Sequence, residues 1–219
     1  MENLKNREET IFTGLFVLGG FSLAVALYQN FVLGHPYFYA LFSLGMFFVL
    51  LSLYNRISGG MLFAGWTLSD TAVFALFLLL TCLLTDHLGM KLGYWEYPHY
   101  GPADDVRKYF LEWGIALLYH MVSLQVGVKL FQKFFPRETT AVLLSLVFIV
   151  TPVGFLTESL NLQVYSWRVI SMPFSNLKIG EFFLIFQTIG YWLMALIPYT
   201  LYLIVDQSVR RREVFENNI

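Results

Sequence analysis

The chain has 219 residues, of which 57% are hydrophobic and 18% aromatic, and its mean hydropathy is +0.61. A chain this apolar cannot cover a soluble core with polar surface, so the composition excludes a soluble globular domain and indicates an integral membrane protein. The formal net charge of -1 leaves no basic field for nucleic acid. The single cysteine, Cys82, lies inside an apolar run and cannot form an internal disulfide.

Six apolar runs have about the 20 residues that are needed to cross a hydrocarbon core. In lipid these runs must be helices, because a membrane barrel would show short alternating segments. The expected fold class is therefore an all-α integral membrane bundle of about six transmembrane helices, forming a single domain over residues 1–219. We place the spans near residues 11–34, 36–54, 67–86, 109–131, 139–159 and 179–205.

The distribution of Lys and Arg predicts the orientation, because these residues gather on the cytoplasmic side of short loops. With an even number of spans, both termini lie on one side, together with most of the Lys and Arg residues. We expect this side to be the cytoplasm, and the membrane to be a bacterial inner membrane. The predicted inner side carries Lys5, Arg7, Arg56, Lys129, Lys133, Arg137, Arg210, Arg211 and Arg212, and the outer side carries Lys91, Arg107, Lys108, Arg168 and Lys178.

One stretch of the chain returns later in altered form. The segment from Asp86 to Trp95 and the segment from Glu158 to Trp167 share a Thr before the acid, the acid itself, a Leu and the Trp. Each copy begins where an apolar run ends, so each places a carboxylate where a buried helix meets a polar loop. We interpret this as an internal two-helix repeat, with units at approximately 67–131 and 139–205.

Each of these loops leads into a helix that is expected to carry a Glu in its first turn, Glu112 in one copy and Glu181 in the other. Parallel repeats would bring the four carboxylates together at one depth near the outer surface. Acids at helix ends are also common as interfacial or dipole-stabilising residues. The duplicated placement favours a functional site, with all four acids as candidate catalytic residues.

Aromatic residues accompany the acids in both loops. Trp95, Tyr97 and Trp167 are candidate substrate-binding residues, although Trp and Tyr at this depth also serve as membrane-interface anchors.

The fourth span carries a polar stripe below the acids. Glu112, Ala116, Tyr119, His120 and Ser123 recur at helical spacing on one side of the helix. Ionisable groups inside a membrane cost several kcal/mol unless they are paired or hydrated, so we expect the stripe to face the bundle interior. His120 is a candidate catalytic residue and Tyr119 a candidate substrate-binding residue.

A metal site is an alternative that the histidines leave open, because carboxylate and imidazole suit zinc, manganese or iron. His35, His87 and His99 lie in loops, but no pair of ligands recurs at the spacing that one helix requires. No phosphate loop, dinucleotide fingerprint or nucleophile elbow occurs. We therefore expect no metal and no cofactor.

The acids and aromatics also resemble the repeat of the small bacterial membrane carotenoid cyclases, the lycopene cyclases built from two related halves. Those cyclases usually carry Pro-x-Glu-Glu at the second acidic position, where this chain has Leu111-Glu112-Trp113 and Gly180-Glu181-Phe182. The stretch from Gly93 to Pro98 also resembles uncharacterised small bacterial multi-spanning membrane proteins. The matching residues are Asp86, Gly93, Trp95, Tyr97 and Glu112 in one half and Glu158, Trp167, Glu181, Phe182 and Phe183 in the other.

The resemblance implies a cofactor-independent cyclisation or isomerisation of an isoprenoid or another membrane lipid. A carboxylic acid among apolar groups keeps its proton and can donate it to an alkene, and Trp faces can stabilise the resulting cation. Two alternatives remain open. One is a transporter or ligand-binding protein in which the acids hold a cation or proton. The other is a structural subunit, either of a homo-oligomer or of a larger membrane complex.

Overall fold

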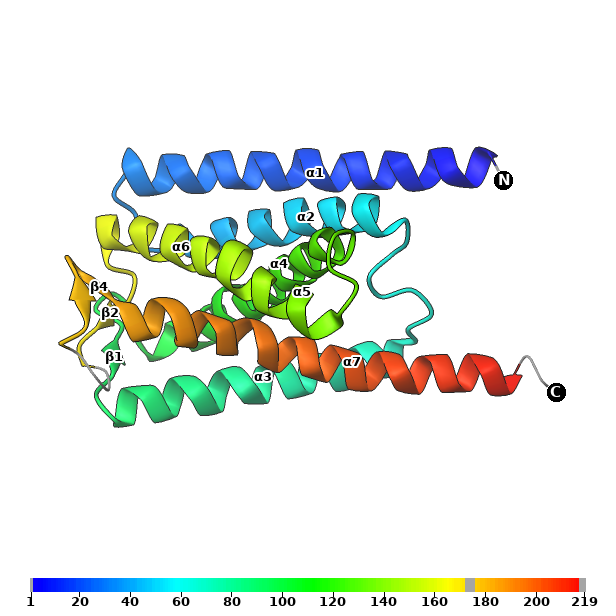
Figure 1. Ribbon diagram of the computed structural model, residues 1–219. Helices are drawn as coiled ribbons and strands as arrows, with labels where there is room; N and C mark the ends of the chain where they lie inside the picture. The colour runs from blue at the N-terminus through cyan, green and yellow to red at the C-terminus, as the bar shows by residue number, and fades with distance from the viewer. Residues whose placement is uncertain (1, 172–175, 217–219) are drawn as a thin grey trace.

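The computed structural model describes residues 2–171 and 176–216, which form an all-α bundle with both ends of the chain at the same end of the molecule (Figure 1). Within these residues, six helical segments are long and apolar enough to cross a membrane. The predicted fold class is confirmed, and the chain is a multi-span membrane protein. The spans are Glu9–Phe31, Tyr39–Ser58, Leu68–Lys91, Arg107–Gln132, Glu138–Val164 and Phe186–Arg212.

Three of the spans combine α-helix with a π-helical stretch. The α-helices are α1 (Glu2–Phe31), α2 (Tyr39–Ser58), α3 (Leu68–Lys91), α4 (Ile115–Gln132), α5 (Glu138–Ser145), α6 (Thr151–Val164) and α7 (Tyr191–Glu216). The π-helical stretches are η2 (Arg107–Gly114) before α4, η3 (Leu146–Val150) between α5 and α6, and η4 (Phe186–Gly190) before α7. Stretches of this kind are frequent at functional sites, and two of the three begin a span beside the acids.

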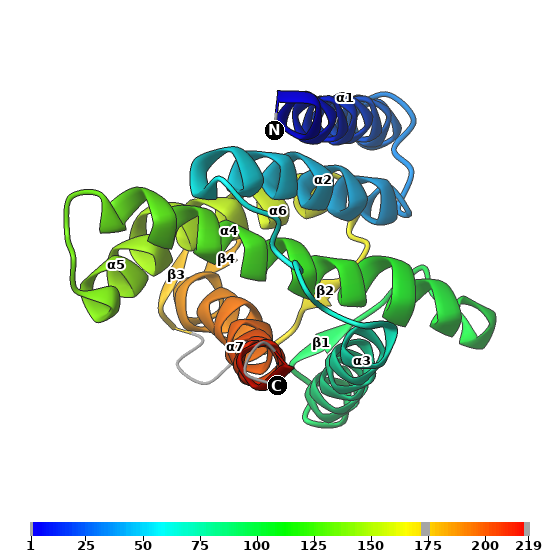
Figure 2. The ribbon, with the colours of Figure 1, turned by 90° about the vertical axis from the view of Figure 1, so that its right-hand side faces the viewer.

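The fourth span is the centre of the bundle. Its most apolar window is 72% buried, compared with 17–33% for the other five spans, whose apolar side chains remain largely exposed. Figure 2 shows α4 between α2 on one side and α3 and α7 on the other. This position follows from its composition, because a span with polar side chains must turn them toward protein and not toward lipid.

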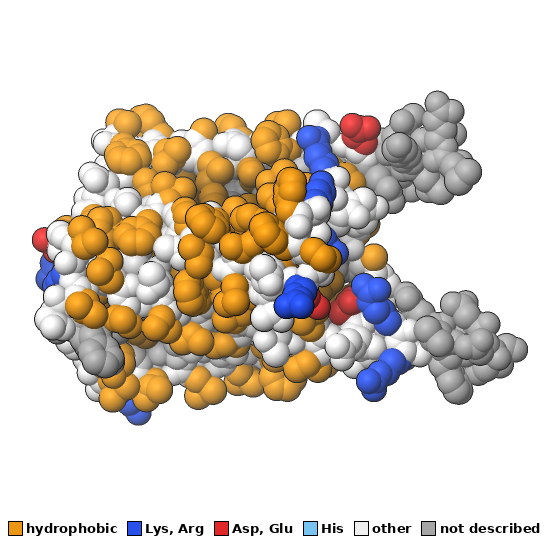
Figure 3. All heavy atoms as spheres, in the orientation of Figure 1, with side chains coloured by type: hydrophobic (Ala, Val, Ile, Leu, Met, Phe, Trp, Pro, Cys, Tyr) orange, Lys and Arg blue, Asp and Glu red, His pale blue; other side chains and the backbone are white. Residues whose placement is uncertain are grey.

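The molecular surface has the zones expected of a membrane protein. Figure 3 shows hydrophobic side chains spread over the middle of the visible face, with most of its Lys and Arg side chains near the end that carries the termini. The cytoplasmic location of that end stays a prediction.

Two short antiparallel strand pairs lie at the opposite end (Figure 1). One pair joins β1 (Trp95–Glu96) to β2 (Arg168–Val169), and the other joins β3 (Lys178–Ile179) to β4 (Phe182–Phe183). The first pair links the two Trp-bearing loops to each other.

The second strand pair corrects the predicted start of the last span. Gly180 adopts the left-handed backbone with φ of 57°, which allows a two-residue turn between β3 and β4. The chain therefore makes a hairpin from residue 178 to residue 183, and the span begins at Phe186 and not at residue 179.

Candidate functional site

The two Trp-bearing loops make the same hydrogen bond. Asp86 accepts from the indole Nε1 of Trp95 at 2.9 Å, and Glu158 accepts from the indole Nε1 of Trp167 at 3.0 Å, in each case with the Trp nine residues after the acid. Both acids are almost fully buried, with 0% and 4% of their surface exposed. The repeated spacing in the sequence thus corresponds to a repeated contact.

Close approaches to glycine backbone hold two rings of the site in place. A Cβ atom at Gly89 on α3 would lie 2.0 Å from Cζ2 of Trp95, and one at Gly154 on α6 would lie 2.5 Å from Cγ of Tyr191. Only glycine leaves room for these rings to lie directly against the helices. Each glycine therefore helps to direct its ring toward an acid.

Asp86 also accepts a hydrogen bond from the Tyr97 hydroxyl and lies 3.6 Å from the Nζ atom of Lys108. The ammonium of Lys108 lies 4.8 Å from the Tyr97 ring centroid and 4.5 Å from that of Tyr109. Burial, followed by the charge of Asp86, raises the pKa of Tyr97 well above its usual value. Asp86 is thus a carboxylate with a cationic partner.

Glu112 is buried, with 2% of its surface exposed, and it lies two residues further into its span than predicted, because the span begins at Arg107 and not at residue 109. It accepts a hydrogen bond from the Tyr100 hydroxyl and lies 3.6 Å from Nε of Arg107. The Arg107 guanidinium in turn lies 3.5 Å above the Tyr37 ring. Burial, followed by the Glu112 charge, raises the pKa of Tyr100. Glu112 therefore also has a cationic partner.

Glu158 differs from the other two acids because its partners are all neutral. The Tyr191 hydroxyl donates to Oε1 at 2.8 Å, in addition to Trp167, and Nδ2 of Asn161 approaches Oε2 at 3.4 Å. Among the residues that the structure describes, no Lys, Arg or His nitrogen lies within 4.0 Å of this carboxyl group. Oε1 therefore accepts two hydrogen bonds of ordinary length, whereas Oε2 has one long contact.

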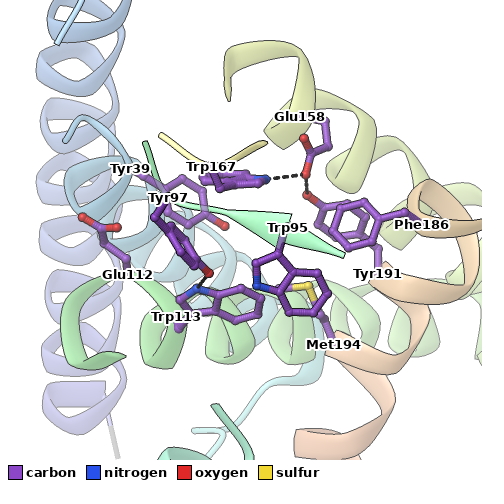
Figure 4. Close-up of a pocket in the computed structure, with 10 residues that line it drawn as sticks. All are labelled: Tyr39, Trp95, Tyr97, Glu112, Trp113, Glu158, Trp167, Phe186, Tyr191 and Met194. Atoms are coloured by element: carbon purple, nitrogen blue, oxygen red, sulfur yellow. Dashed lines mark hydrogen bonds between the residues drawn. The ribbon is translucent and has the colours of Figure 1, made fainter. Parts of the chain in front are cut away.

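Aromatic side chains from five parts of the chain surround a small cavity between Glu112 and Glu158. Its volume is about 20 Å³, and Figure 4 shows the two acids on opposite sides of the rings. Trp113 donates from its indole nitrogen to the Tyr97 hydroxyl at 2.6 Å, which ties the box to Asp86. We call the rings the aromatic box; they are Tyr39, Trp95, Tyr97, Trp113, Trp167, Phe186 and Tyr191.

A chain of hydroxyl groups leads from the box into the bundle. Tyr39 and Tyr119 are 3.1 Å apart at their hydroxyl oxygens, and Tyr119 and Thr157 are 3.0 Å apart. Thr157 donates to the Val153 carbonyl at 2.9 Å, so it must accept from Tyr119, and Tyr119 must accept from Tyr39. The Tyr39 oxygen is left as an acceptor at the box. Tyr119 therefore lies behind the box and not in its wall.

His120 is fully buried, as the polar stripe predicts, but it does not reach the carboxylates by hydrogen bonds. Its Nδ1 atom lies 2.8 Å from the Ala116 carbonyl oxygen, and its Nε2 atom has no hydrogen-bond partner within the described residues. Its ring stacks on Tyr191 with a centroid distance of 5.0 Å. His120 thus supports the side chain that donates to Glu158.

Glu181 is the one predicted acid that lies apart. The expectation that it opens a helix is wrong, because it occupies the turn of the β3–β4 hairpin, where its side chain is exposed. It lines a separate polar cavity of about 290 Å³ at the end of the bundle opposite the termini, together with Glu158, Arg168 and Lys178. Glu158 therefore lies between this polar cavity and the aromatic box.

No three His, Cys, Asp or Glu side chains converge into a possible metal site in the part of the chain that the structure describes. Cys82 is a buried free thiol in the wall of an apolar groove between α3 and α7.

Several residues of the site were not predicted. Lys108 was counted only for orientation, although its position at the start of an apolar run was a signal of burial. Tyr39 and Tyr191 come from α2 and α7. The sequence around a single aromatic residue in an apolar span does not indicate which residue it will contact. The hairpin could have been predicted, because Gly180 and Glu181 separate two pairs of strand-forming residues.

Together these features define a six-span helical membrane protein with buried carboxyl groups set among aromatic rings at one end of the bundle. No family model, curated protein or solved structure matches the chain.

Proposed function

We propose that the chain is a membrane-embedded enzyme that protonates an isoprenoid or another lipid, as a cyclase or isomerase does, with Glu158 as the proton donor. The observation that carries this proposal is the environment of Glu158, a buried carboxyl group with neutral partners beside a box of aromatic rings. A buried carboxyl group without a cation favours the protonated form, because burial penalises charge.

The other two acids fit supporting roles. Asp86 and Glu112 each lie within 4.0 Å of a cationic side chain, Lys108 and Arg107 respectively, whereas Glu158 has no such partner among the described residues. The same pairing opposes a cation-binding role for Asp86 and Glu112, because a transported cation would have to displace a lysine or an arginine. We assign Asp86, Glu112 and His120 to positioning the box, and we place the exposed Glu181 outside the acid set.

The proposed reaction needs no co-reactant. Glu158 transfers its carboxyl proton to one carbon of an alkene, so that the π bond breaks and a C–H bond forms. The cavity of about 20 Å³ holds about one water, so the rings of the box must move apart to admit the alkene. The faces of Trp95, Trp113 and Trp167 then lie against the carbocation and attract its positive charge. Loss of a proton from a neighbouring carbon to the Glu158 carboxylate then gives a double-bond isomer and restores the acid. Where a second alkene of the same molecule first attacks the cation, its π electrons form a C–C bond, and loss of a proton beside the new cation gives a ring. The outer polar cavity allows Glu158 to exchange protons with water.

Two structural proposals accompany this function. We propose that the units near 67–131 and 139–205 are an internal repeat, supported by the matching acid–indole bonds and by the pairing of Glu96 with Arg168 at the centre of β1–β2. We also propose a bacterial inner-membrane location with cytoplasmic termini, supported by the Lys and Arg side chains near that end (Figure 3).

The experiment follows proton transfer directly. The protein is reconstituted in liposomes with an isoprenoid extract of bacterial membranes in deuterated buffer, and mass spectrometry measures deuterium in carbon-bound positions of the lipids. We expect protein-dependent incorporation that falls by about 10²–10⁴-fold in Glu158→Gln, the usual contribution of a general acid. Gln keeps an oxygen acceptor for Trp167 and Tyr191, so the fold should persist.

The matched control is Glu181→Gln, which removes an acid of the outer end that lies outside the box. We expect this variant to incorporate deuterium at the wild-type rate. Equal rates in Glu158→Gln and the wild type, or no incorporation that depends on the protein, would overturn the proposal.

A further inference from the structure

An apolar groove runs along the outside of the bundle between α3 and the segment formed by η4 and α7. It extends from Thr81 to Leu92 on one side and from Ile185 to Ile197 on the other, and its volume is about 490 Å³. Both walls belong to membrane-spanning segments, and Leu84, Leu88 and Leu193 in them are 50–70% exposed. The groove therefore faces the hydrocarbon of the bilayer.

The inner wall of the groove is the outer wall of the aromatic box. Trp95, Trp113, Phe186 and Met194 line both the groove and the small cavity beside Glu158. Figure 4 shows Trp95, Trp113 and Met194 together on one side of the box, away from Glu158. A molecule in the groove is separated from the proposed acid by one layer of side chains.

The length and the lining of the groove suit a hydrocarbon chain. Thr81 to Leu92 spans about 16 Å at about 1.5 Å per residue, and the side chains along the groove are almost all apolar. The volume lies within the range of about 300–1,000 Å³ that is usual for small-molecule sites.

We infer that this groove binds the hydrocarbon chain of the substrate, which enters sideways from the bilayer and reaches the box past Trp95 and Trp113. The inference rests on the proposed function, since it names the substrate as a long-chain lipid or isoprenoid and gives its path to Glu158. The apolar walls supply affinity by burying the chain, and the rings at the inner end place its reactive carbons beside the acid.

The test uses binding and not turnover. A C16 fatty acid with a diazirine near its methyl end is added to the reconstituted full-length protein, irradiated, and located by peptide mass spectrometry. We expect labels in residues 81–92 and 185–197, in Glu158→Gln as well as in the wild type, because binding precedes chemistry. Leu193→Trp should fill the groove and reduce this labelling at least several-fold.

Ile204→Trp is the matched control, because Ile204 is an exposed residue of α7 that lies outside the groove wall. It should leave the labelling unchanged. Labels spread evenly over all six spans, or unchanged labelling in Leu193→Trp, would overturn the inference. Deuterium incorporation is measured in a separate assay, so the two proposals can fail independently. If the groove is not labelled but deuterium incorporation depends on Glu158, the groove inference fails and the proposed function stands. If the groove is labelled but no deuterium is incorporated, the proposed function fails and lipid binding in the groove stands.

Discussion

Gly89→Ala should disrupt the first acid–indole pair without touching either member of it. The new Cβ would lie 2.0 Å from Cζ2 of Trp95, whereas carbon atoms pack at about 3.5–4.0 Å, so the ring must move by about 1.5 Å or more. That movement breaks the 2.9 Å hydrogen bond to Asp86.

The expected cost can be worked out from three contributions. Overpacking costs about 1–3 kcal/mol. Loss of a hydrogen bond to a charged group costs about 1.5–3 kcal/mol. Alanine in a helix offsets about 1 kcal/mol of this. The variant should therefore be less stable by about 2–5 kcal/mol.

Unfolding in detergent, followed by tryptophan fluorescence as denaturant is added, measures this difference. Gly20→Ala is the matched control, because a Cβ there meets no atom within 4 Å outside its own helix. It should be unchanged or up to about 1 kcal/mol more stable. The reasoning is refuted if Gly89→Ala is as stable as Gly20→Ala.

Two further predictions concern the paired acids. Lys108→Met should destabilise the protein by about 3–5 kcal/mol, because it leaves Asp86 buried without a cation, and adding Asp86→Asn should restore much of the loss in a denaturant-unfolding cycle. If the losses of unfolding free energy in the two single variants simply add in the double variant, the two side chains do not interact as an ion pair. Tyr97 and Tyr100 have pKa values raised above 10.0, so their contribution to stability is complete below about pH 10 and is lost as pH rises through the folded-state pKa. The unfolding midpoint of the wild type, measured from pH 8 to pH 11, should fall at the alkaline end, and that of Tyr97→Phe should fall less. The same pH profile in both proteins would contradict the prediction.

Local features of the sequence were enough to predict the bundle. The length of an apolar run and the absence of water in a bilayer together require a helix, whatever the other spans do. The burial of His120 followed in the same way, because a polar side chain in a span must face protein. The repeated acid–Trp spacing correctly predicted two matching acid–indole contacts, since in each copy the Trp follows its acid by nine residues.

Only the tertiary structure decided which of these acids has a cation beside it. The partners of Glu158 include Tyr191 from another span, and Lys108 reaches Asp86 across a loop. Such contacts depend on how helices pack, and hydrophobic periodicity does not encode the identity of the facing helix. Glu181 shows the same limit at short range, because pairing between β3 and β4 replaced the first turns of the expected helix. The apolar groove likewise exists only because α3 and α7 lie beside each other, and no single segment contains it.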